Sequence, residues 1–219
     1  MNPDLRRRAF AEALGTGFLA LVVVGSGIMG QRLFPGQDGL ALLANSLATG
    51  GGLYALILSF ASLSGAHFNP AVTLASAALR QQPWIEVPAY LGAQCLGAVL
   101  GVAATHAMFA LPALQASTHA RSGLPLLLSE CVGTSLLVFV ILQTRRTCPE
   151  RTPMAVAAVV TGGYWFTAST FFTNPALTVG RALTESFVGI RPGDAPAFIL
   201  AQLFGAGAAV ALGRALSKD

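Results

Sequence analysis

Two copies of the tripeptide Asn-Pro-Ala are the part of this 219-residue chain best suited to binding chemistry. The copies consist of Asn69, Pro70 and Ala71, and of Asn174, Pro175 and Ala176. Asn is a favourable N-cap and Pro fits the first helical position, so one copy alone is typical of an ordinary helix start. Two copies at matching places in the two halves of an apolar chain instead indicate short helices that aim their N-termini at a solute, as channels and transporters do.

The chemistry expected of two such helix ends is selection of small neutral solutes. Each helix N-terminus carries roughly +0.5 elementary charge. If both meet near the middle of a membrane, they disfavour a monovalent cation by about 4 kcal/mol at ~4 Å and an effective dielectric of ~20. The asparagine amides offer N–H donors, and the backbone at residues 64–68 and 170–173 offers carbonyl acceptors. A polar stripe of this kind opposite apolar walls suits small uncharged hydroxylated molecules.

The composition places these motifs in a membrane protein. Hydrophobic residues make up 54% of the chain, charged residues only 10%, and the mean hydropathy is +0.65. A soluble domain carries about 25% charged residues, so most of this chain cannot face water. The net charge of +4 comes with no basic face, which excludes a nucleic-acid partner. The three cysteines lack metal-ligand spacing and no nucleophile–base pair is evident, so we expect no enzyme, no metal site and no cofactor.

Helices long enough to cross a bilayer need about 20 apolar residues, and the chain offers six. The candidate spans are 8–30, 40–61, 85–111, 124–143, 153–172 and 195–212. Two shorter segments, 69–79 and 174–184, begin with the Asn-Pro-Ala copies and are expected to dip into the membrane as re-entrant half-helices. The predicted fold class is therefore an all-α membrane protein with six transmembrane helices and two half-helices, in a single domain over residues 1–219.

An internal repeat relates the two halves, at about 1–115 and 116–219. Residues 12–16 resemble residues 130–134, and residues 88–98 resemble residues 196–206. Three spans per half is an odd number, so the second half must enter the membrane upside down, with the solute site at the interface of the halves. The Asn-Pro-Ala segments fall at equivalent places in this inverted repeat.

The distribution of Lys and Arg predicts that both termini are cytoplasmic. With the N-terminus inside, nine basic residues fall on the cytoplasmic side and four on the outer side. The cytoplasmic set is Arg6, Arg7, Arg8, Arg80, Arg145, Arg146, Arg151, Arg214 and Lys218, and the outer set is Arg32, Arg121, Arg181 and Arg191.

The segment Ser-Gly-Ala-His-Phe-Asn-Pro-Ala-Val-Thr at residues 64–73, the second Asn-Pro-Ala, the repeat and the six spans together resemble the major intrinsic protein family of aquaporins and aquaglyceroporins. The resemblance covers nearly the whole chain. It implies an aquaporin-like fold, a homotetramer with one pore per subunit, and a bacterial inner membrane location. The partners it implies are the lipid bilayer and small neutral solutes.

Three polar residues take roles from this resemblance. His67 corresponds to the family histidine on the cytoplasmic half of the pore, although a buried structural histidine is the alternative interpretation. Glu12 and Glu130 correspond to glutamates that accept hydrogen bonds from the re-entrant loops. Carboxylates inside a membrane need partners, so we expect a scaffolding role rather than a proton relay.

The resemblance also implies a selectivity filter at Thr49, Gly162, Phe171 and Leu177. Most members of the family carry Arg where this chain has Leu177, and water-selective members carry bulky groups where it has Thr49 and Gly162. We therefore expect a wider constriction without the usual fixed cation. This filter resembles that of a bacterial branch associated with arsenic resistance, which implies arsenite and methylated arsenicals as solutes beside glycerol, urea and water.

Two further questions stay open at the level of the sequence. Arg181 lies one helical turn beyond Leu177, so it either reaches into the outer vestibule or pairs with Glu185. A coupled secondary transporter is the competing class of function, because inverted repeats and broken helices serve it equally well. A plain glycerol and water facilitator and a structural membrane protein are the remaining alternatives.

Overall fold

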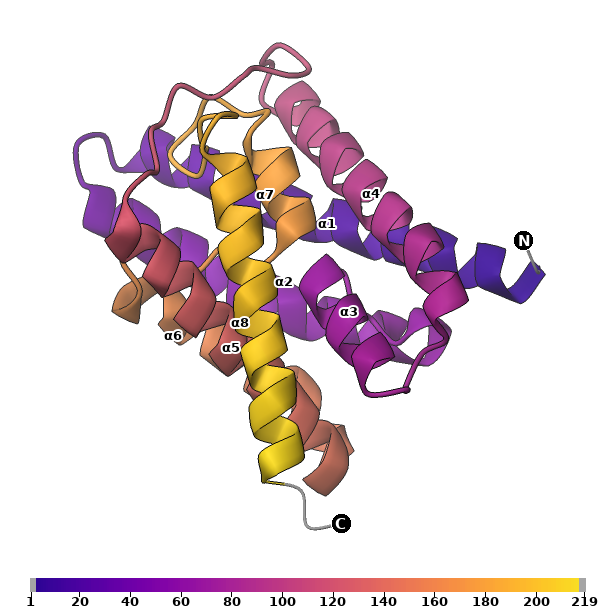
Figure 1. Ribbon diagram of the computed structural model, residues 1–219. Helices are drawn as coiled ribbons and strands as arrows, with labels where there is room; N and C mark the ends of the chain where they lie inside the picture. The colour runs from indigo at the N-terminus through magenta and orange to yellow at the C-terminus, as the bar shows by residue number, and fades with distance from the viewer. Residues whose placement is uncertain (1–2, 217–219) are drawn as a thin grey trace.

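The computed structural model describes residues 3–216, which form helices and connecting segments without a β-strand (Figure 1). The α-helices are α1 (Pro3–Leu33), α2 (Asp38–Ser64), α3 (Pro70–Ala78), α4 (Val87–Met108), α5 (Leu124–Thr147), α6 (Thr152–Phe166), α7 (Pro175–Arg181) and α8 (Ala195–Ala215). Two single turns of 3-10 helix, η1 (Trp84–Glu86) and η2 (Pro149–Arg151), lead into α4 and α6. The all-helical fold class is as predicted. Lys218, counted above among the cytoplasmic basic residues, lies outside the described residues.

Five helices in the described part of the chain are long and apolar enough to cross a membrane, namely α1, α2, α4 with its preceding turn, α5 and α8. The predicted sixth span, residues 153–172, corresponds to the shorter helix α6, whose 15 residues end at Phe166. At 1.5 Å per residue, α6 is about 22 Å long, which is less than the ~30 Å hydrocarbon core. Residues 167–173 are not helical and run as an irregular segment to Asn174.

In the view of Figure 1, the two short helices α3 and α7 lie between α8 and α4, with α1 and α2 behind them. Each begins with a proline at its first position and an asparagine N-cap, as the Asn-Pro-Ala copies predict. They are shorter than predicted: α3 ends at Ala78 and α7 at Arg181. Each packs against both α4 and α8, and so contacts its own half as well as the opposite half.

Small residues allow the long helices to pack closely in equivalent pairs, α1 with α4 and α5 with α8. A Cβ atom at Gly97 would collide with the carbonyl of Ala13, and one at Gly205 would collide with the carbonyl of Cys131. The backbones therefore touch at these two crossings, which is the helix packing that small residues permit in membranes. These contacts hold the frame around α3 and α7.

Candidate pore and its lining

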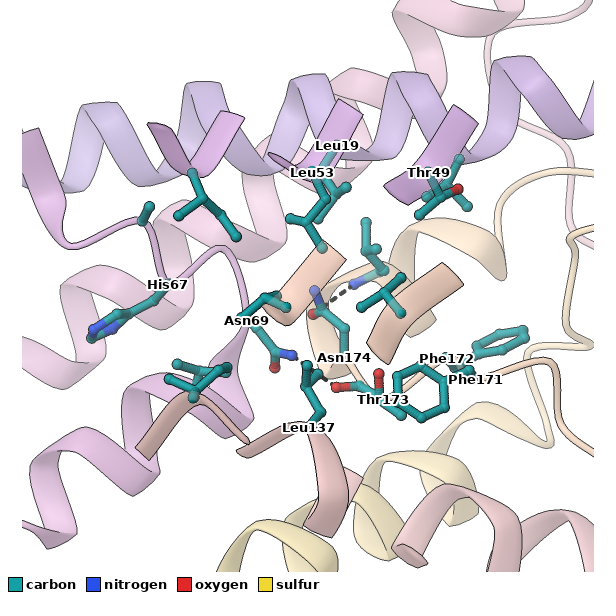
Figure 2. A pocket seen from close by; sticks show the side chains of 18 of the residues that line it. Leu19, Thr49, Leu53, His67, Asn69, Leu137, Phe171, Phe172, Thr173 and Asn174 are labelled. Atoms are coloured by element: carbon teal, nitrogen blue, oxygen red, sulfur yellow. Dashed lines mark hydrogen bonds between the residues drawn. The ribbon is translucent and has the colours of Figure 1, made fainter. Parts of the chain in front are cut away.

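The side chains of Asn69 and Asn174 meet in the middle of the molecule (Figure 2). Asn69 Nδ2 donates a 2.8 Å hydrogen bond to the carbonyl of Thr173, and Asn174 Nδ2 donates one of the same length to the carbonyl of Phe68. Each asparagine thus binds the residue that immediately precedes the other asparagine. The N-terminal ends of α3 and α7 are brought together by this reciprocal pair.

Each asparagine also caps its own helix. Asn69 Oδ1 accepts from the backbone N–H of Ala71, and Asn174 Oδ1 accepts from those of Ala176 and Leu177. A side-chain amide has two N–H donors, and the reciprocal bond uses one of them. Since both asparagines line the central cavity, each has a second N–H donor for a molecule in it. Pro70, Ala71, Pro175 and Ala176 are buried in the helix starts and are not among the residues that line the cavity.

The irregular segments before the two asparagines adopt an unusual backbone conformation. Positive φ angles occur at Ala66 (49°) and Phe68 (51°) in the first segment, and at Thr170 (62°), Phe171 (55°) and Thr173 (47°) in the second. A left-handed non-glycine residue costs about 1–2 kcal/mol, so such segments need support from their surroundings.

That support comes from two buried carboxylates. Glu12 accepts hydrogen bonds from the backbone N–H groups of His67 (2.9 Å) and Phe68 (2.7 Å). Glu130 accepts from those of Phe172 (3.0 Å) and Thr173 (2.8 Å). Both side chains are fully buried, and neither forms an ion pair within the described residues.

A glutamine completes each carboxylate site in the same way. Gln94 Nε2 donates to Glu12 (2.7 Å) and to Thr73 (3.0 Å), whereas Gln202 Nε2 donates to Glu130 (2.6 Å) and Thr178 (2.9 Å). The two glutamines occupy equivalent positions in the segments that resemble each other at 88–98 and 196–206. The geometry fits the scaffolding role expected of Glu12 and Glu130, because every acceptor bond goes to the segments they hold or to their supporting side chains.

The asparagine pair lies in a narrow cavity of about 70 Å³, which is room for a few water molecules. Figure 2 shows His67 toward one end of this cavity, the asparagines in the middle, and Thr49 and Phe171 toward the other end. We call these ends the His67 end and the Thr49 end. The walls are mainly aliphatic and come from rows of residues four apart on three helices: Thr49, Leu53 and Ile57; Leu137, Ile141 and Arg145; and Val156, Val160 and Tyr164.

Three of the four residues assigned to a selectivity filter, Thr49, Phe171 and Leu177, line this cavity and are buried. Gly162 does not line it, which corrects that part of the filter. A Cβ at Gly162 would contact Phe166, an exposed residue on the outer face of α6. Tyr164 faces the cavity instead. Because two residues are about 200° apart around a helix, Gly162 faces away from it.

Arg181 lines the same cavity as Leu177 and is 3% exposed. Its guanidinium carbon lies 3.2 Å from the centre of the Phe172 ring, and its Nε donates to the carbonyl of Val188 at 2.5 Å. The alternative pairing with Glu185 is not formed: Glu185 accepts from the backbone N–H and the hydroxyl of Thr118. Of the two interpretations left open above, the structure has Arg181 at the cavity.

His67 is half-buried and lines the cavity, with Nδ1 3.1 Å from the hydroxyl of Thr73. Its ring also packs at a tilt against Tyr90. The histidine therefore combines both interpretations given above, since one ring nitrogen has a structural contact and the side chain still faces the cavity.

Two polar lining residues were missed in the sequence. Tyr164 was absent from the predicted filter, and its hydroxyl lies 3.1 Å from that of Thr49. Arg145 was assigned to a cytoplasmic loop, but α5 continues to Thr147 and carries Arg145 along the wall of the cavity. Both could have been found from rows of residues spaced four apart, which share one face of a helix. These rows are Val156, Val160 and Tyr164, and Leu137, Ile141 and Arg145.

Comparison with known proteins shows the family of this chain. Residues 1–168 match the major intrinsic protein family. Aquaglyceroporin AqpS of Rhizobium meliloti (strain 1021) is 49% identical over 211 residues, which are 96% of this chain and 90% of that protein. Aquaporin NIP6-1 of Arabidopsis thaliana is 32% identical over 192 residues, and the matched region is 62% of its length.

The fold is similar to that of a solved channel. The X-ray structure of the aquaglyceroporin from Plasmodium falciparum superposes with a TM-score of 0.73 over 96% of this chain and 94% of that one, at 21% identity. The architecture around the asparagine pair, the match over residues 1–168 and the extent of identity to AqpS lead to one conclusion. The chain is a member of the major intrinsic protein family.

Proposed function

We propose that the protein is a passive, uncoupled pore for small uncharged hydroxylated solutes as well as water. As a member of its family it is a membrane channel for water and small solutes, and not an enzyme. The observation that carries the finer proposal is the asparagine pair. Asn69 and Asn174 each have one N–H donor beyond the reciprocal bond, in a cavity whose walls are mainly aliphatic. A hydroxylated solute can accept those donors while its carbon atoms contact the apolar walls.

Cation exclusion follows from the charges around this site. The N-termini of α3 and α7 face each other across the asparagine pair, and their partial charges sum to about one elementary charge. The guanidinium of Arg181 packs over the ring of Phe172, which lies toward the Thr49 end (Figure 2), and so adds a full charge there. Neutral solutes carry no net charge and are not repelled by this field. A small cation, in contrast, would have to cross two positive regions in a medium of low dielectric.

For the selectivity filter we propose Thr49, Phe171 and Leu177 together with Tyr164 and Arg181. Arg181 is then the fixed cation of a filter that lacks arginine at position 177, and it is set one helical turn further along α7. Leu177 is a branched aliphatic side chain and offers no hydrogen-bond donor. A larger solute therefore meets no fixed polar group at this position. AqpS is described as an aquaglyceroporin, and glycerol-like polyols are accordingly the first solutes we propose.

Arsenite in its undissociated form and methylated arsenicals are also proposed as solutes. Undissociated arsenite presents hydroxyl groups in a compact neutral molecule, which is the chemistry that the asparagine donors and the aliphatic walls accommodate. This part of the proposal rests on the resemblance of Thr49, Phe171 and Leu177 to an arsenic-associated filter.

We further propose that the channel is a homotetramer in a bacterial inner membrane, with both termini in the cytoplasm and two inverted halves at about 1–115 and 116–219. The matched sites of Glu12 and Glu130 support the relation of the halves. With this orientation, the Thr49 end of the cavity faces outward and the His67 end faces the cytoplasm.

Purified protein in liposomes tests the function directly. Stopped-flow light scattering should show water and glycerol permeabilities above those of protein-free liposomes, with a glycerol flux that scales with its gradient and scarcely saturates. The same rates are expected with and without a proton or sodium gradient. Strict dependence on either gradient would identify a coupled transporter, and absence of any solute flux would indicate a structural protein.

A further inference from the structure

The His67 end of the central cavity adjoins a second cavity, and most of the residues that the two cavities share are polar. The central cavity, with a volume of about 70 Å³, adjoins a larger cavity of about 390 Å³. Four residues line both cavities and so surround the passage between them: Ile57, His67, Arg145 and Thr152. We call this set the neck. Three of its four members are polar, whereas the lining of the central cavity is mainly aliphatic.

Arg145 is a fixed cation in the neck. Its Nη2 donates one hydrogen bond of 2.9 Å to the carbonyl of Gly65, in the irregular segment that leads to Asn69. No ion pair with a carboxylate is formed by Arg145 within residues 3–216. A guanidinium has five N–H donors, so the bond to Gly65 holds the group in place and leaves donors for a passing molecule.

Thr152 and His67 add hydrogen-bonding groups to the same passage. The hydroxyl of Thr152 is buried and has no hydrogen-bond partner within the described residues. A buried hydroxyl without a partner costs free energy, and a polar molecule in the neck would remove that cost. His67 uses Nδ1 toward Thr73, and its Nε2 has no hydrogen bond within residues 3–216. Ile57 provides an apolar wall in the same ring.

We propose that the neck is a second selectivity ring in which Arg145 is the specificity-determining residue. The ring binds small neutral solutes whose oxygen atoms accept hydrogen bonds from the guanidinium, and whose hydroxyl groups bond to Thr152 and His67. Its positive charge repels cations at the end of the pore opposite Arg181. The asparagine pair is thus flanked by one arginine on each side. This inference rests on the proposed channel function.

Variants reconstituted in proteoliposomes test this proposal, with water flux, glycerol flux and sodium leak measured on each. Arg145→Met removes the charge and the donors at similar length. We expect its ratio of glycerol to water permeability to fall severalfold and its sodium leak to rise at least about tenfold, since one charge at low dielectric is worth more than that factor. Arg145→Lys should keep sodium excluded but lose part of the glycerol preference, because an ammonium lacks the planar donor set.

The matched control is Arg151→Met, which removes a mostly exposed arginine of the neighbouring turn η2 and should behave like the wild type in all three measurements. Arg145→Met with wild-type glycerol-to-water ratio and wild-type sodium leak would overturn the proposal. If Arg145→Met does not yield monodisperse protein, Thr152→Val decides: a lowered glycerol ratio supports the ring, and an unchanged ratio overturns it. A wild-type protein without solute flux would instead refute the channel function itself.

Discussion

The phenol oxygen of Tyr164 lies 3.1 Å from the hydroxyl oxygen of Thr49, across 115 residues of sequence. This contact joins α2 to α6 at the Thr49 end of the cavity, and both side chains are buried. A small residue at position 49 therefore does not leave an empty space, because it makes room for the hydroxyl of a tyrosine from the facing helix. The size of the filter depends on the pair rather than on either position alone.

Tyr164→Phe should reveal the contribution of this pair. The substitution keeps the ring but leaves the Thr49 hydroxyl without its partner, so we expect a loss of about 1 kcal/mol in stability and a raised permeability to apolar relative to hydroxylated solutes. Thermal unfolding in detergent and stopped-flow flux measure the two effects. Thr49→Val alone and the double variant complete a cycle; strictly additive effects would show that the two hydroxyl groups do not interact.

Leu177→Arg tests the arrangement of the filter. A second guanidinium one helical turn from Arg181 would narrow the Thr49 end and add donors, so glycerol permeability should fall by roughly tenfold, the factor that about 1.4 kcal/mol of added barrier produces. Water permeability should change much less. Leu177→Met, which conserves apolar character and approximate volume, is the control. Equal losses for water and glycerol would count against the placement of Leu177 in the filter.

Replacement of the buried carboxylates tests their role as scaffolds. In Glu12→Gln, the amide nitrogen replaces one of the two carboxylate oxygens, so the backbone N–H of either His67 or Phe68 faces a donor in place of its acceptor, which costs about 1–3 kcal/mol. We expect a clearly lowered melting temperature and less monodisperse protein in size-exclusion chromatography.

Glu130→Gln should produce the same loss, because the carboxylate holds Phe172 and Thr173 in the equivalent way. The control for both is Glu150→Gln, at an exposed carboxylate in the turn η2. Wild-type melting behaviour in both buried variants would contradict a scaffolding role.

The loop around Glu185 should respond to acid. Hydrogen bonds from the backbone N–H and hydroxyl of Thr118 lower the pKa of this carboxyl below its ordinary value of 4.5. A lowered pKa in the folded state means that the contact stabilises the loop above pH 4.5 and that this stabilisation is lost as the pH falls through the lowered pKa. The protection factors of residues 112–123, which compare their hydrogen exchange with the intrinsic rate at the same pH, should therefore fall at acidic pH. Glu185→Gln should show the lower protection factors already at neutral pH and lose their pH dependence, and a variant that keeps this dependence would refute the assignment.

The fold and the centre of the site could be predicted because their signals are local in the sequence. Apolar runs gave the long helices, and the Asn-Pro-Ala copies gave the starts of α3 and α7. The exception was α6, whose apolar sequence continues past Phe166 although the chain there leaves the helix. Hydropathy does not distinguish a helix from an irregular segment that is buried in protein, so the length of that span was wrong.

The lining of the pore was harder to predict because it depends on which face of each helix points inward. Gly162 was assigned by counting along the chain from Asn174, whereas the cavity selects positions around the helix, where Tyr164 follows Val160. Arg145 was assigned to a loop because a charge at the end of an apolar run usually marks the membrane surface. Its spacing from Ile141 indicates a place in the wall, but only once the inward face of α5 is known.

The reciprocal bonds of the two asparagines have a consequence for the origin of the molecule. Neither half can satisfy its own central amide, because the acceptor carbonyl belongs to the other half. A half inserted alone would leave a polar group unpaired in the membrane, and a second copy in the opposite orientation would supply the missing partner. Fusion of two such copies makes that encounter intramolecular, with a high effective concentration. The centre of the pore is, in this sense, the interface of a dimer contained in one chain.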